Sequence, residues 1–203
     1  MFSCKETAIE GNDLYFENPQ PINDSYLKEI PNKFLGLYKN ADSVFLKIDK
    51  TMITKYYFGK FKIHKTELDS MKNDFEIANE KLVEKKTKNI FETKKIGDSI
   101  ELFSKNTDTI FQISDTQKVK RISGNLVLNS KNVDHWQVNI LTLNAKILKF
   151  KYLSVEDLKS LDSIASTKST MIDSTNYLLK PSQKEFKKIS NMKLSNEFLY
   201  QKL

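Results

Sequence analysis

The sequence has few cysteines, glycines and arginines and no long apolar run, and each shortage excludes a class of site. The single cysteine, Cys4, excludes an internal disulfide framework and a cysteine-based zinc cluster. The five glycines lie far apart, so the chain contains neither a phosphate-cradling loop nor a dinucleotide-binding fingerprint. No apolar run approaches the roughly 18 residues that a membrane-spanning helix needs.

Positive charge is abundant, but nearly all of it is lysine. The net charge is +7, and Arg121 is the only arginine among the 33 basic residues. Sites that grip phosphates or bases rely on the planar arginine fork, which lysine does not reproduce. The lysines are also spread among aspartates and glutamates rather than massed in one block. We therefore expect a solvated lysine surface and no nucleic-acid partner.

The residues that most often carry catalysis are scarce. The two histidines, His64 and His135, have no histidine, cysteine or glutamate at ligand spacing nearby. The Gly-x-Ser-x-Gly elbow of serine hydrolases is absent. We expect no catalytic residue, no cofactor and no metal ligand, and hence no enzyme. A carboxylate-based hydrolase is kept as a third hypothesis, because such sites leave little trace in one sequence.

The stretch 118–153 gives the strongest fold signal. It reads as three antiparallel strands joined by the polar loop 130–135 and the short turn 144–146. Along the third strand, apolar residues alternate with lysines, which is typical of a sheet with one wet face. If the strands pair in order, one apolar patch forms, and we take its members as candidate ligand-facing residues: Trp136, Val138, Ile140, Leu148, Phe150 and Tyr152. The alternative is that these side chains are core.

The whole pattern predicts a mainly β protein: a curved antiparallel meander or partly open barrel of about nine or ten strands. Two C-terminal helices, near 155–165 and 182–190, are expected to pack over it, and residues 154–157 form a capping box. The stretch 66–82 fits both a helix and strands, and we expect a short helix near 66–73 followed by strands. Residues 23–203 are taken as one β-rich domain.

Residues 1–22 differ from the rest of the chain. They carry a net charge of −3, and glycine, asparagine and prolines break their periodicity, which predicts a flexible tether. A small residue, Ser3, precedes Cys4, as in the sequence that ends a bacterial lipoprotein signal. In this respect the start of the chain resembles bacterial lipoproteins, whose processed cysteine carries the lipid. The resemblance implies lipidation at Cys4 and a signal peptide already removed.

The ordered chain also resembles uncharacterised lipoproteins of flavobacteria and related Bacteroidetes. The likeness rests on Leu126-Val127-Leu128-Asn129, on Trp136-Gln137-Val138 and on the ending 177–189, while 31–38 resembles the entry strand of a lipocalin-like barrel. It implies a lipid-anchored protein of the cell envelope, at the outer membrane or in the periplasm, that contacts the membrane only through its anchor. We expect a non-enzymatic binding module for an apolar small molecule. The alternative is a protein-partner module that neutralises a toxin or scaffolds a complex.

Overall fold

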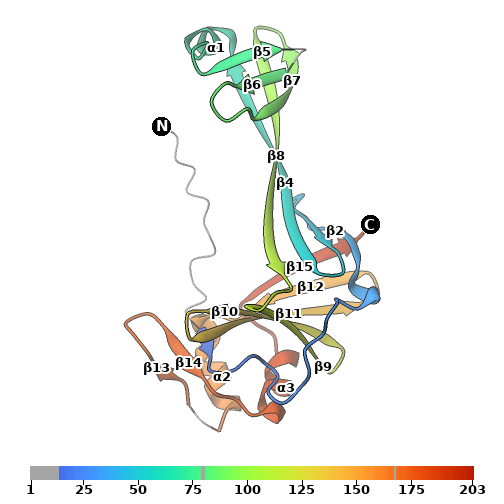
Figure 1. The fold of residues 1–203 in the computed structure, drawn as a ribbon, viewed down its shortest axis with the longest axis vertical. Coiled ribbons are helices and arrows are strands. Elements are labelled where there is room, and N and C mark those ends of the chain that lie inside the picture. Colours follow the sequence, from blue (N-terminus) through green and yellow to red (C-terminus); the bar gives the residue numbers. More distant parts are fainter. Residues whose placement is uncertain (1–13, 79–80, 167) are drawn as a thin grey trace. The chain divides into compact units, whose positions relative to one another are not determined.

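The computed structural model describes residues 14–78, 81–166 and 168–203 (Figure 1). The protein is 51% strand and 15% helix, so the predicted mainly β class is confirmed. The sheet is open and does not close into a barrel. The described residues form 15 strands, more than the nine or ten predicted, together with three α-helices.

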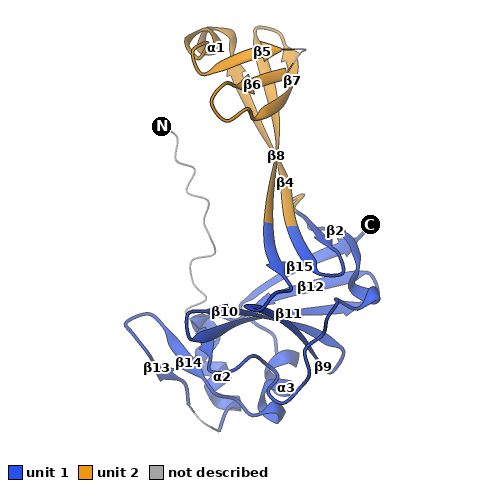
Figure 2. Ribbon diagram, in the orientation of Figure 1, with its two compact units in different colours: residues 1–41, 45–54, 109–203 blue, residues 42–44, 55–108 orange. Residues whose placement is uncertain are grey.

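The chain divides into two compact units (Figure 2). Unit 1 comprises the described residues up to Ala41, Phe45–Thr54 and Thr109–Leu203, and unit 2 comprises Asp42–Val44 and Lys55–Asp108. The span 23–203, expected as one domain, therefore contains both units. Strands β4 and β8 contribute residues to each of them.

Unit 1 contains most of the strands. Their order is β13-β14-β1-β11-β12-β15-β2-β3, and β10 pairs with β11 and with β9. Every pairing among them is antiparallel except that of β1 with β14. Their bounds are β1 (Leu14–Phe16), β2 (Gly36–Lys39), β3 (Phe45–Ile48), β9 (Gln117–Ile122), β10 (Asn125–Asn132), β11 (His135–Asn144), β12 (Ile147–Tyr152), β13 (Thr170–Met171), β14 (Tyr177–Leu179) and β15 (Asn196–Lys202).

The stretch 118–153 contains four antiparallel strands, β9 to β12, where three were predicted. The first predicted strand is divided at Ser123-Gly124, whose φ angles of 49° and 83° close a two-residue hairpin. Glycine favours such turns because it adopts positive φ without strain. The predicted loop 130–135 is also tighter than expected, since Asn132 pairs with His135 across two residues.

The flexible tether predicted over 1–22 is corrected for its described part. Leu14 and Phe16 are buried in β1, which pairs with β11 and β14. The buried amide of Asn129 accepts a hydrogen bond from Gln20 N (2.6 Å) and donates one to Gln20 O (2.8 Å). These contacts make residues 14–20 part of unit 1. The buried side chains and the paired backbone outweigh the effect of the glycine, asparagine and prolines on which the tether was predicted.

The two predicted C-terminal helices are present in unit 1. A 3-10 turn, η2 (Val155–Asp157), leads into α2 (Leu158–Ile164), and α3 (Gln183–Asn191) follows. Ser154 and Asp157 form the predicted capping box, and Ser182 with Glu185 forms another. Figure 1 shows both helices on one side of the sheet. There Phe186 and Ile189 of α3 join a core with Phe16, Val138 and Ile140. A further 3-10 turn, η1 (Asn32–Phe34), precedes β2.

Unit 2 is a small antiparallel sheet with one helix. Its strand order is β4-β8-β7-β6-β5. The elements are β4 (Met52–His64), α1 (Lys65–Ser70), β5 (Phe75–Ala78), β6 (Lys81–Glu84), β7 (Ile90–Ile96) and β8 (Ser99–Gln112). The prediction of a short helix followed by strands is therefore confirmed. The helix is capped by His64, whose side chain forms a capping box with Glu67.

Candidate functional site

The six candidate ligand-facing residues do not form one patch. Residues directly opposite each other in an antiparallel pair share a face. In the β11–β12 ladder, Ile140 lies opposite Lys151, and Leu141 lies opposite Phe150. One face therefore holds Trp136, Val138 and Ile140, and the other holds Leu148, Phe150 and Tyr152.

Four of the six side chains are core. Val138, Ile140, Leu148 and Phe150 are each at most 2% exposed. Trp136 is half-buried, packs against the core beneath the helices and pairs with Phe16. Tyr152 stacks on Phe150 with ring centroids 4.6 Å apart, and burial raises the pKa of its hydroxyl. This arrangement gives the six residues a packing role in unit 1.

The two histidines lie in different elements and perform different tasks. His64 is the N-cap of α1, and its Nδ1 accepts a hydrogen bond from Thr66 N at 3.4 Å. His135 opens β11, with its ring 6.1 Å from that of Tyr15. Over the described ranges, no three His, Cys, Asp or Glu side chains gather as a metal site would require. Cys4 lies outside the described residues.

Two buried lysines of unit 1 serve the fold. Lys151 Nζ donates to Ser190 O (3.2 Å) and Met192 O (2.9 Å) and lies 3.7 Å from Glu197. Burial lowers the pKa of Lys151, and the Glu197 carboxylate opposes that shift. Lys120 Nζ donates to Pro19 O and Pro21 O. Both amines are occupied by backbone carbonyls, so we assign them to holding loops in place rather than to chemistry.

Unit 2 has a very small core. The described chain contains 30 buried apolar residues, and only Leu82 and Leu102 of these belong to unit 2. The same unit exposes Phe58, Phe61 and Ile77 by more than half of their surface. Such a sheet exposes apolar side chains to solvent, and a contiguous patch of them commonly marks a binding surface.

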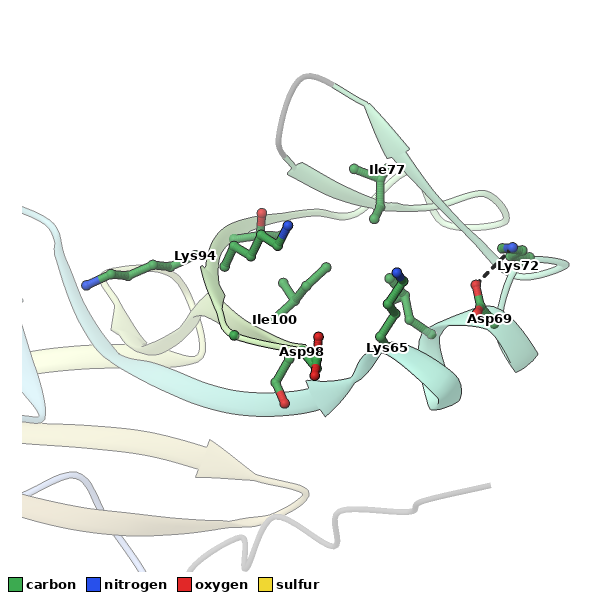
Figure 3. Close-up of a pocket in the computed structure, with 12 residues that line it drawn as sticks. Lys65, Asp69, Lys72, Ile77, Lys94, Asp98 and Ile100 are labelled. Carbon is green, nitrogen blue, oxygen red and sulfur yellow. Dashed lines mark ion pairs between the residues drawn. The ribbon is translucent and has the colours of Figure 1, made fainter.

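Unit 2 also contains a hollow of about 670 Å³ (Figure 3). It lies between α1 and one face of the sheet, and its lining includes Leu68 from α1, Ile77 from β5 and Ile100 from β8. The register places Ile77 opposite Leu82 and Ile100 opposite Lys95 on that face. A smaller hollow of about 180 Å³ shares Leu68 and Ile77 and reaches Leu82. The volume of the larger hollow, about 670 Å³, falls in the range of roughly 300–1,000 Å³ that is typical of small-molecule sites.

The wall of the hollow is charged. Asp69 on α1 pairs with Lys72 at 2.9 Å, and the hydrogen bond and charge of Lys72 lower the pKa of Asp69. Lys65 and Asp98 also line the hollow, and Lys65 N donates a backbone hydrogen bond of 2.9 Å to Asp98 O. An apolar floor beneath charged side chains would accept a molecule with both apolar and polar parts.

This site was not predicted from the sequence. The sequence feature related to it is the stretch 66–82, which fits both a helix and strands. Leu68, Met71, Phe75, Ala78 and Leu82 recur at helical spacing. The helix ends at Ser70, however, and Phe75 begins a strand. Apolar residues that one long helix would align are thus divided between α1, which holds Leu68, and the strands β5 and β6.

Comparison with family models, curated proteins and solved structures finds no match for the chain. Within the part of the chain that the structure describes, no helix is both long enough and apolar enough to cross a membrane.

Proposed function

We propose that the protein is a non-enzymatic binding module of the bacterial cell envelope and that it binds an apolar small molecule in the hollow of unit 2. The observation that carries the proposal is a hollow of about 670 Å³ in a unit with two buried apolar residues. A ligand in that place would supply the apolar contacts that the unit lacks, at about 25 cal/mol per Å² buried.

The proposal is tested by Ile77→Glu. Ile77 lines the hollow and is 53% exposed, so the substitution should leave the fold intact. A carboxylate in an apolar site loses its hydration, and we expect binding of the neutral dye Nile red to weaken about tenfold or more. Fluorescence titration of the folded variant measures this change.

Ile90→Glu is the matched control. Ile90 is 62% exposed and lies in the same sheet, but it does not line the hollow. Ile77 pairs with Leu82 and Ile90 pairs with Val83, so the two isoleucines lie on opposite faces. We expect Ile90→Glu to bind the dye like the wild type. Equal dye affinity in Ile77→Glu and the wild type would remove the hollow as the binding site.

A protein partner is the second candidate function. Phe58 and Ile90 are 56% and 62% exposed in unit 2 without lining the hollow. Exposed apolar side chains outside the hollow are the kind of surface that a protein partner buries. If Ile90→Glu loses binding of the dye while Ile77→Glu keeps it, the exposed surface outside the hollow is the binding site, which favours this candidate.

We also propose that Cys4 carries a lipid that anchors the protein at the outer membrane or in the periplasm. The support is Ser3-Cys4 and the resemblance to bacterial lipoproteins. Expressed in a bacterial host behind a lipoprotein leader, the wild type should sediment with membranes, whereas Cys4→Ser should be soluble. Immunoblots of the two fractions measure the difference, and identical partitioning would contradict the anchor.

A further inference from the structure

The hollow of unit 2 carries an excess of positive charge. Its lining includes four lysines and two aspartates, a net charge of +2. Lys72 is already paired with Asp69 at 2.9 Å, which removes one charge of each sign. Three lysines then face one aspartate: Lys65, Lys94 and Lys95 against Asp98.

The three lysines differ in direction. Figure 3 shows the amine of Lys65 pointing into the hollow toward Ile77, whereas Lys94 points away from it. Within the described ranges, the Lys65 amine forms no ion pair. The charge of Lys65 helps to lower the pKa of Asp69, but Asp69 forms its ion pair with Lys72. The Lys65 amine beside the apolar wall can therefore accept an anion, because a carboxylate there forms a charge-assisted hydrogen bond.

We propose that the ligand of the hollow is a single-chain amphiphile with a carboxylate head, such as a free fatty acid. The chain lies against Leu68, Ile77 and Ile100, and the carboxylate pairs with Lys65 Nζ. The inference rests on the proposed function, since it names the ligand class of the same site. Chain burial and head pairing contribute separately, so each has its own measurement.

The chain contribution predicts a dependence on length. Each buried CH₂ raises affinity about fourfold, so affinity should climb from octanoate to decanoate to dodecanoate, below their micelle concentrations. The alcohols of equal length should show the same slope at lower affinity. Isothermal titration calorimetry of the full chain gives both series.

The head contribution is tested by Lys65→Gln, with Lys86→Gln as the control, because Lys86 is an exposed lysine of unit 2 that does not line the hollow. Lys65→Gln should bind dodecanoate roughly fivefold more weakly and dodecanol unchanged, because only the carboxylate pairs with the amine. Lys86→Gln should bind both like the wild type. Raised salt should weaken dodecanoate binding to the wild type and leave dodecanol binding to it unaffected.

The outcomes separate the two proposals. If neither dodecanoate nor dodecanol binds the wild type, the hollow is not a small-molecule site, and both proposals fall. If both bind and Lys65→Gln leaves the dodecanoate affinity unchanged, the apolar site stands and the carboxylate assignment is overturned. If Lys65→Gln and Lys86→Gln weaken dodecanoate binding equally, general surface charge accounts for the effect, and the pairing with Lys65 is overturned.

Discussion

Phe16→Ala is expected to lower the free energy of unfolding by about 3–5 kcal/mol, as removal of a fully buried phenylalanine does. Phe16 is 0% exposed in β1, and its ring meets that of Phe186 edge to face, with centroids 5.9 Å apart. The substitution leaves a cavity between β1 and α3 that rigid neighbours fill only in part. Urea denaturation followed by circular dichroism measures the loss.

Phe61→Ala is the matched control, because Phe61 is 54% exposed in β4. We expect it to cost less than about 1 kcal/mol. A double-mutant cycle of Phe16→Ala with Phe186→Ala should add a coupling of about 0.5–1.5 kcal/mol for the ring pair. A loss below about 1 kcal/mol in Phe16→Ala would show that residues 14–22 are a tether after all.

Local signals in the sequence predicted the elements that depend on local chemistry. The capping box of Ser154 and Asp157 is present because a side chain satisfies backbone amides only a few residues away. Period-2 alternation likewise identified β12. Each signal lies within a single short segment, so neither requires knowledge of the rest of the fold.

Contacts between distant segments were beyond the reach of these signals. β1 has three residues, and its parallel partner β14 lies near the other end of the chain. Nothing within 14–16 specifies that partner. The flexible tether was inferred from composition alone, and composition does not report a pairing partner.

Register explains why the six-residue patch did not form. Each strand alternates as predicted, but the tight turn after Asn144 sets Asn144 opposite Ile147. That register puts Ile140 and Phe150 on opposite faces. A shift of one residue would exchange the faces of a strand, and the alternation of each strand is the same in either register.

The candidate site escaped prediction for a further reason. The hollow exists because α1 ends at Ser70, and helical spacing in the sequence continues past that point. A cavity is a lack of packing between elements. In the sequence, it is visible only as more apolar residues than a small unit can bury.

Ligand binding is expected to stabilise unit 2 far more than unit 1. A unit with two buried apolar residues opens locally at low free energy, and its amides then exchange with solvent. A ligand bound only to the closed form, at a concentration of 100 times its dissociation constant, adds about 2.7 kcal/mol of stability. Exchange governed by that opening should slow about 100-fold.

Hydrogen exchange with and without dodecanoate therefore tests the central claim, which is that the hollow of unit 2 binds an apolar ligand. The predicted result is about 100-fold slower exchange in β5, β6 and β7, with unchanged exchange in β9 to β12 of unit 1. Unchanged exchange in β5 to β7 at saturating dodecanoate, or protection confined to unit 1, would contradict it.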